Sequence, residues 1–285
     1  MGPGLRAVGL AFALAASLGS NARASITVYN LFKTIDYRQT SIAQPTTPVR
    51  YYGAAAVDFN NPGDLTGALV SSSSPNSPFT LNLTGPGSAY YGTPAYATKA
   101  ELDRVIPNGT AYTYRLNGGT FNGQAATLST PASDSYTSTV PFFTGNTYAA
   151  LQNVDASRSI LLTFNPFTAP AGTTNASTFL KITRVADGVP VYDMSGPSSL
   201  SSASVGANTL AAGTQYNLSI VYSSRISTPG AGFGGATSLI SYDLRTELTF
   251  TTAAAVPEPA SIVSAAIGAV CVLGYRSRRR GASVG

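Results

Sequence analysis

The segment from Leu210 to Tyr222 constrains the fold more than any other part of the chain. It reads LAAGTQYNLSIVY, and every second residue from Tyr216 to Tyr222 is large and apolar. Successive side chains of a strand point to opposite faces of its sheet, so this spacing puts four apolar side chains on one face. The segment therefore predicts a β-strand that follows a Gly-Thr turn.

Similar runs predict strands along the whole body of the chain. They lie at 26–32, 51–59, 79–83, 111–116, 160–164, 179–185 and 244–251. Gly, Pro, Asn and Ser, which favour turns, separate them. One helix is predicted from Thr98 to Ile106, because Thr98 and Glu101 form a T-x-x-E capping box and Pro107 ends the segment. We expect an all-β protein of one or two β-sandwich modules.

The composition favours the same fold class. Only 10% of the residues are charged, and the chain contains 28 Gly and 18 Pro, as expected for a β protein with many turns. The single cysteine is Cys271, close to the C-terminus. The body therefore has no disulfide and depends on its core, for which a chain of 285 residues is long enough.

The Leu210–Tyr222 segment resembles the L-x-P-G-T-x-Y entry to the F strand of fibronectin type III-like domains. Ala212 takes the position that is usually proline. In that family the first tyrosine, here Tyr216, closes a corner by hydrogen-bonding to upstream backbone. Ile160–Phe167 is similar to the B strand, with Phe164 where the family often has Trp. Glu247–Thr252 is similar to the closing strand.

This resemblance covers Asn146 to Thr252 and implies a β-sandwich. We predict two units in the body: a β-rich module at 25–145 and a fibronectin type III-like β-sandwich at 146–253. The sequence PFFTGN (Pro141 to Asn146) marks the boundary. The first module would pack against the second or share strands with it.

Residues 1–24 have the pattern of a signal peptide. A short start containing Arg6 precedes the apolar stretch from Ala7 to Gly19, and an A-x-A box follows. The box is formed by Ala22 and Ala24, so cleavage would leave Ser25 as the first residue. We expect export through the Sec machinery.

Residues 254–285 contain three successive elements: VPEPAS, an apolar run at 262–275 and the basic sequence RSRRR. The motif residues are Val256, Pro257, Glu258, Pro259, Ala260 and Ser261, and the basic residues are Arg276, Arg278, Arg279 and Arg280. This tail resembles the PEP-CTERM sorting signal of exported bacterial proteins. The resemblance implies recognition by an exosortase-type membrane peptidase and delivery to the cell surface.

The physical properties of the tail agree with this interpretation. Pro257 and Pro259 keep Glu258 in an extended segment that fits an enzyme cleft. The apolar run is short compared with the roughly 20 residues of a typical span, but local thinning of the bilayer would let it cross. The arginines would stay cytoplasmic, which leaves Glu258 outside. The alternative is a plain anchor that is never cut.

We therefore expect a signal helix and a C-terminal transmembrane helix on either side of the all-β body. The protein would be exported and held in the inner membrane by its C-terminal helix. It would then reach the cell surface or the extracellular matrix.

The charge distribution argues against nucleic acid as a partner. The chain has a net charge of +5, but residues 25–255 contain three Lys and eight Arg against eleven acidic residues, which sum to zero. The excess lies in the two terminal segments, where positive charge serves membrane targeting.

Few residues in the chain suit catalysis. It has no histidine, so a Ser-His-Asp hydrolase would lack its base and a zinc site its main ligands. The only G-x-S-x-G string, at 281–285, lies beyond the basic tail. We predict a non-enzymatic protein without a cofactor, although a glycosidase with two carboxylates stays open.

Two weaker candidates for binding sites remain. Asp58, Asn60 and Asp64 offer oxygen ligands in a D-x-N-x-x-G-D loop, but the loop departs from the EF-hand pattern and is also typical of a plain turn. The tyrosine pairs at 51–52 and 90–91 could stack on sugar rings, or they could fill β-sheets. Their members are Tyr51, Tyr52, Tyr90 and Tyr91.

Our functional hypothesis is a structural or adhesive protein in an exopolysaccharide layer, sorted by a PEP-CTERM and exosortase system. This role follows from the family association of the tail. The alternatives are a carbohydrate-binding module and, less favoured, a secreted glycosidase.

Overall fold

The computed structural model describes residues 25–254 and confirms the all-β prediction. The strands are β1 Ile26–Arg38, β2 Pro48–Phe59, β3 Gly67–Ser71, β4 Phe79–Gly85, β5 Ser88–Gly92, β6 Ala111–Asn117, β7 Ala125–Ser129, β8 Ile160–Thr163, β9 Asn175–Arg184, β10 Pro190–Pro197, β11 Ser202–Val205, β12 Gln215–Gly232 and β13 Ala236–Thr251. The helices are α1 Lys99–Val105 and α2 Gly145–Leu151, with a 3₁₀ turn at Gly119–Phe121.

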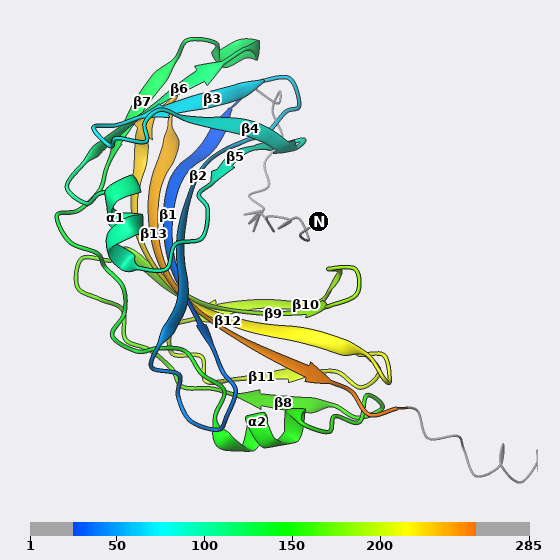
Figure 1. Ribbon diagram of the computed structural model, residues 1–285. Helices are drawn as coiled ribbons and strands as arrows, with labels where there is room; N and C mark the ends of the chain where they lie inside the picture. Colours follow the sequence, from blue (N-terminus) through cyan, green and yellow to red (C-terminus); the bar gives the residue numbers. More distant parts are fainter. Residues whose placement is uncertain (1–24, 255–285) are drawn as a thin grey trace, which may run out of the picture.

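Eleven strands form one sheet in the order β10-β9-β12-β13-β1-β2-β5-β4-β3-β6-β7, and β8 and β11 form a second, small sheet. β1 lies in the middle of the large sheet, where it pairs in parallel with β13 and antiparallel with β2. Figure 1 shows this sheet bent into a C, with α1 on the outer side of the bend. β1, β2, β12 and β13 are long enough to run through the bend.

The same face of the large sheet is covered at both ends of the C, which produces two hydrophobic cores. The N-terminal core lies under β3, β4, β6, β7 and α1, and the C-terminal core lies under β8, β11 and α2. β13 contributes Ile240 and Tyr242 to the first core and Leu248 and Phe250 to the second. Because these positions differ by even numbers, all four side chains point to the same face.

Helix α1 forms as predicted, and the capping box is confirmed. The Glu101 backbone N–H donates to Thr98 Oγ1, and the Glu101 carboxylate accepts from the Thr98 backbone N–H. The helix lies directly over Gly53 of β2. A Cβ at that position would come within 2.3 Å of Ile106 Cδ1 and 2.9 Å of the Phe32 carbonyl oxygen. Glycine therefore allows α1 to pack closely against the sheet.

The corner predicted at Tyr216 is confirmed. The Ala211 backbone N–H donates to the Tyr216 hydroxyl oxygen at 2.8 Å, and the Tyr216 ring stacks on Phe250 with 5.7 Å between centroids. Phe164 is also buried in this C-terminal core. The helix α2 was not predicted from the sequence. Its N-cap residue Thr144 makes no side-chain capping hydrogen bond.

The two cores share the long strand β13, and each core contains residues from both sides of the predicted boundary. Residues after 146, including Phe233 and Tyr242, belong to the N-terminal core, and Phe143 belongs to the C-terminal core. The division into domains at 25–145 and 146–253 stays a prediction. Within residues 25–254 no helix has the length and apolarity needed to span a membrane, and the predicted segment at 262–275 lies outside the described residues.

We predict that Tyr216→Phe lowers the free energy of unfolding by about 1 kcal/mol, because the Ala211 N–H loses its acceptor. Urea denaturation would measure the change. Tyr148→Phe is the matched control, since that hydroxyl donates to the Thr40 carbonyl at an exposed site where water can replace it. Equal losses in the two variants would contradict a special role for the corner.

Candidate functional site

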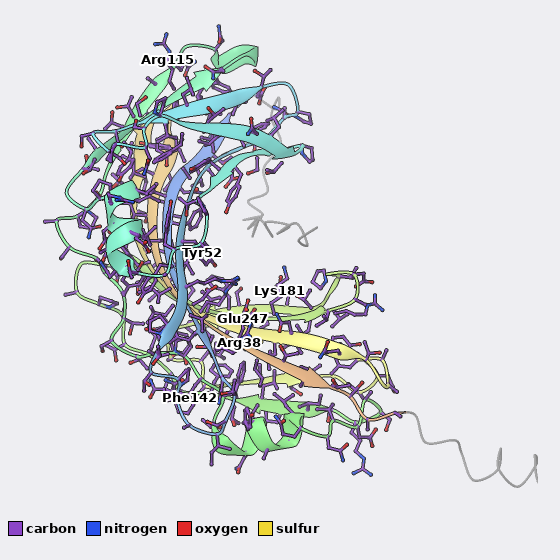
Figure 2. The ribbon with its side chains drawn as sticks, viewed as in Figure 1. Arg38, Tyr52, Arg115, Phe142, Lys181 and Glu247 are labelled. Carbon is purple, nitrogen blue, oxygen red and sulfur yellow. The ribbon has the colours of Figure 1, made fainter. Side chains whose placement is uncertain are left out.

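The face of the large sheet opposite the two cores carries a band of charged residues. We call this face the inner face, because it lies on the inner side of the C. Figure 2 shows Tyr52, Lys181 and Glu247 close to the bend. The strand register connects Lys181 and Glu247, since both pair with Ser219. The charged members at the bend are Asp36, Arg50, Asp243, Arg245 and Glu247.

Asp36 is the centre of an ion network on this face. Its carboxylate is 1% exposed and accepts two hydrogen bonds from Arg245, at 2.8 Å from Nε and 2.7 Å from Nη2. Arg50 Nε also donates to it. Glu247 lies 3.1 Å from Arg245 and 3.7 Å from Arg50. Two arginines and two carboxylates therefore form a neutral group across β1, β2 and β13.

Tyr52 lies beside this network and interacts with both arginines. The guanidinium carbons of Arg50 and Arg245 are 5.9 and 5.5 Å from the centroid of its ring, within the range of a cation–π contact. Burial raises the pKa of the Tyr52 hydroxyl. The ring therefore serves as an apolar support for the two charged groups.

A second polar chain lies further along the same face. Arg225 lies over the ring of Phe179 at 4.9 Å, and its Nε donates to Ser223 Oγ at 3.1 Å. Ser223 and Ser241 share a hydrogen bond of 2.8 Å, and Ser241 Oγ donates to Asp243 at 2.7 Å. Burial raises the pKa of Asp243, although the two serines partly offset this effect.

The opposite face of β1 holds a separate charged group, which we call the Lys33 cluster. Its members are Lys33, Lys99, Asp103, Asn108 and Asp134. Lys33 is 0% exposed, and its Nζ donates to Asp103 at 2.5 Å, to Asp134 at 2.7 Å and to Asn108 Oδ1 at 3.1 Å. Lys99 contacts both carboxylates. Burial would raise the pKa of Asp134, but hydrogen bonds from the two lysines hold it below its usual value.

Sequence reasoning did not identify either charged group. Arg245 is 209 residues from Asp36 in the chain, and Asp36, Arg50 and Arg245 meet only through strand pairing. One signal was present, since Arg245 and Glu247 are two residues apart in a strand and must share a face. The pairing partners that complete each group could not be read from the sequence.

The structure separates the members of each tyrosine pair. Tyr51 and Tyr91 point to the covered face, where Tyr91 stacks on Phe79 with 5.0 Å between centroids. Tyr52 and Tyr90 point to the inner face. The four residues therefore do not form one surface.

The oxygen-rich loop after β2 uses its polar side chains for local contacts. Asn60 Nδ2 donates to Ser25 Oγ at 2.5 Å, and Asn61 Nδ2 donates to Asp64 at 3.3 Å. Burial raises the pKa of Asp58, at the end of β2. Within residues 25–254 no group of three or more His, Cys, Asp or Glu side chains is placed to hold a metal ion.

The predicted targeting residues lie almost entirely outside the described residues. These are the signal-cleavage residues Ala22 and Ala24, the sorting motif at 256–261 and the basic residues at 276–280. Ser25, the predicted first residue after cleavage, is described. Its carbonyl accepts a hydrogen bond from the Asn60 backbone N–H at 3.1 Å.

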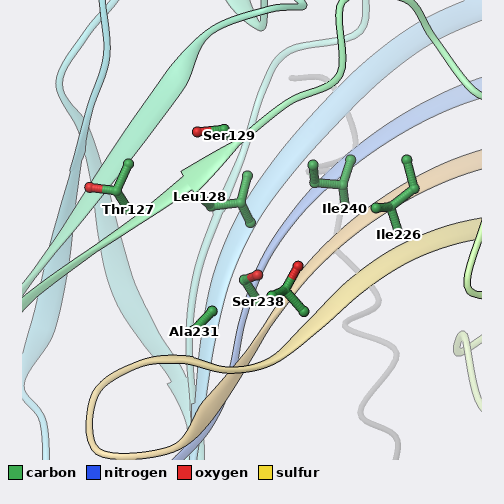
Figure 3. Close-up of a pocket in the computed structure, with 8 residues that line it drawn as sticks. Thr127, Leu128, Ser129, Ile226, Ala231, Ser238 and Ile240 are labelled. Atoms are coloured by element: carbon green, nitrogen blue, oxygen red, sulfur yellow. The ribbon is translucent and has the colours of Figure 1, made fainter. Parts of the chain in front are cut away.

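A pocket of about 190 Å³ lies where β7 approaches β12 without pairing with it. Figure 3 shows Leu128 and Ile226 on opposite sides of this space. Its lining residues are Thr127, Leu128, Ser129, Ile226, Thr228, Ala231, Ser238 and Ile240. None of these eight side chains is charged, so the pocket offers hydroxyl and apolar contacts only.

Comparisons with known proteins gave structural matches only. No family model and no curated protein matches the chain. The FN1–FN3 domains of chicken CNTN1 match over 76% of this chain at 10% identity and a TM-score of 0.23. A bacterial ice-binding adhesin of 1.5 MDa matches over 80% at 12% identity and the same TM-score. This chain covers 66% and 65% of those chains, and such TM-scores do not establish a common fold.

We predict that Asp36→Asn destabilises the protein by about 2–3 kcal/mol, because both arginines lose a buried counter-ion. The loss should fall short of that for a fully buried pair, since Arg50 and Arg245 reach solvent. Chemical denaturation would measure it. Asp155→Asn removes a carboxylate from an exposed pair with Arg158 and should cost less than about 1 kcal/mol. Similar costs for the two variants would refute the central role of Asp36.

Proposed function

We propose that this chain is an exported, non-enzymatic protein of the cell surface or extracellular matrix, sorted through its PEP-CTERM tail by an exosortase-type peptidase. The observation that carries the proposal is the order VPEPAS, apolar run and RSRRR after the β-rich body. Its role would be structural or adhesive within an exopolysaccharide layer.

The position of the folded body relative to the two proposed cleavage points supports this assignment. β1 begins at Ile26, directly after the expected signal cleavage, and Ile26 is already buried. At the other end, the Ala253 backbone N–H donates to the Val154 carbonyl at 2.7 Å. The sorting motif begins three residues later, at Val256. Removal of both terminal segments would therefore leave the two cores intact.

The inner-face network supports a structural role for its carboxylates. A glycosidase needs two carboxyl groups that can reach the glycosidic bond. Asp36 is 1% exposed and is held by two arginines, and Glu247 contacts the same two arginines. These groups stabilise the sheet at its bend and are poorly placed to reach a sugar.

The test is the intact mass and location of the protein expressed in its own host, beside a Glu258→Ala variant. We expect the wild type to begin at Ser25, to end near Pro257 and to be found outside the cell. Glu258→Ala should keep its tail and stay in the membrane fraction. Ser264→Ala, a small change within the apolar run, is the control and should be processed normally. If wild type and Glu258→Ala both keep the basic tail in the membrane, sorting by an exosortase is wrong.

Glycan binding is the second candidate function, and the placement of Tyr52 and Tyr90 on the inner face favours it. Both side chains are partly exposed and lie on strands that pair directly with each other. An aromatic ring on an open sheet presents an apolar face with a polar edge, which suits stacking on a sugar ring.

We predict that, if this face binds polysaccharide, Tyr52→Ala combined with Tyr90→Ala weakens binding at least tenfold on a glycan array or in calorimetry. Thermal denaturation of the double variant would show whether the fold persists. Tyr148→Ala on α2 is the control, because this tyrosine lies away from the inner face. Unchanged binding by the folded double variant would exclude these tyrosines as the site.

A further inference from the structure

The Lys33 cluster brings an amine, a carboxamide and two carboxylates into direct contact in the interior of the protein. Lys33 is on the covered face of β1, and Asn108 follows α1, 75 residues further along the chain. Lys33 Nζ is 3.1 Å from Asn108 Oδ1, and the Asn108 side chain also hydrogen-bonds to Asp134. Asp103 lies 2.5 Å from the same Nζ.

The Lys33 end of the cluster is shielded from water, whereas Lys99 and Asp103 lie toward the surface. Lys33 is completely buried, and Tyr136 and Tyr242 pack next to the cluster with their ring centroids 5.3 Å apart. Neither tyrosine hydroxyl has a hydrogen-bond partner among the described residues. Nζ donates to both Asp103 and Asp134, so a carboxylate is in place on either side of the amine to take a proton from it.

We propose that Lys33 and Asn108 become joined by an intramolecular amide bond between Nζ and Cγ, with Asp103 and Asp134 transferring the protons. The fold holds the two groups in contact, which supplies the proximity that the uncatalysed reaction lacks. Asn108 is the favoured acceptor because its carboxamide is neutral. The carboxylates of Asp103 and Asp134 are each also held by Lys99, so their negative charge resists attack by an amine.

The reaction balances without an oxidant or a reductant. The Lys33 ammonium gives one proton to Asp103, and the neutral Nζ attacks Cγ of Asn108 to form the new C–N bond. A second Nζ proton passes through Asp134 to Asn108 Nδ2, and the bond from Cγ to Nδ2 breaks. Ammonia leaves and takes the proton from Asp103 as ammonium, so both carboxylates return to their starting state.

The bond would connect the central strand of the large sheet to the segment between α1 and β6. The body has no cysteine with which to form a disulfide. A cross-link closing a 75-residue loop would stabilise the folded state by restricting the unfolded chain, as a disulfide does, and would be insensitive to reducing agents.

The test is the mass of the purified exported protein, followed by peptide mapping. We expect the wild type to be lighter than its processed sequence by about 17 Da, the mass of one ammonia. A branched peptide should contain both Lys33 and Asn108. Lys33→Met and Asn108→Ala should each have the full mass of their sequences, whereas Lys99→Met, the control, should keep the deficit.

Two results would overturn the proposal. A wild type with the full mass of its processed sequence would show that the Lys33 cluster is an ion-pair network alone. A deficit of about 18 Da, with Lys33 linked to Asp103 or Asp134, would show loss of water and exclude Asn108 as the acceptor. Because the wild type decides both points, the test holds even if a variant fails to fold. The result of this test also does not depend on how the C-terminal tail is sorted, since peptide mapping detects the cross-linked peptide directly.

Discussion

The insertion of β1 between β13 and β2 is the interaction on which the rest of the structure depends. β1 pairs in parallel with β13 over eleven residue pairs, from Val28 with Thr237 to Arg38 with Glu247, although the partners are about 200 residues apart in the chain. This pairing joins the two ends of the body into one sheet. Tyr29 and Leu31 of β1 lie in the N-terminal core beside Ile240 of β13, and β13 continues into the C-terminal core with Leu248 and Phe250.

β1 also places charge on both of its faces. Asp36 points to the inner face, where Arg50 and Arg245 neutralise it, and Lys33 points to the covered face, where Asp103 and Asp134 neutralise it. Charges this deep in a sheet are tolerated only when they are paired. Each group draws its partners from several elements, so both act as links between segments that are far apart in the chain.

Local patterns predicted local structure well. The alternation after Gly213 predicted β12, and the capping box predicted α1, because neighbouring residues alone determine these features. The corner at Tyr216 was implied by the resemblance to fibronectin type III-like domains. The five-residue strands β3, β5 and β7 were not predicted, whereas the four-residue β8 was, because Ile160, Leu161 and Leu162 form a continuous apolar run. α2 also escaped prediction, because Thr147 rather than Glu or Gln stands three residues after its N-cap Thr144, so no capping box marks its start. The candidate sites were harder still, since Asp36 and Lys33 acquire their partners only through tertiary contacts.

The sequence by itself determined the fold class, the strand β12 and the helix α1, because alternation and capping are patterns of neighbouring residues. The expectations for export and sorting also came from the sequence alone, since the targeting motifs are short and continuous. Only the tertiary structure decided that the body is organised around one eleven-stranded sheet with two cores on the same face. It alone placed Tyr51 and Tyr91 among core residues and Tyr52 and Tyr90 on the inner face. The physical reason is that strand order and register depend on pairing between distant segments, and a one-residue change in register would reverse which side chains are buried.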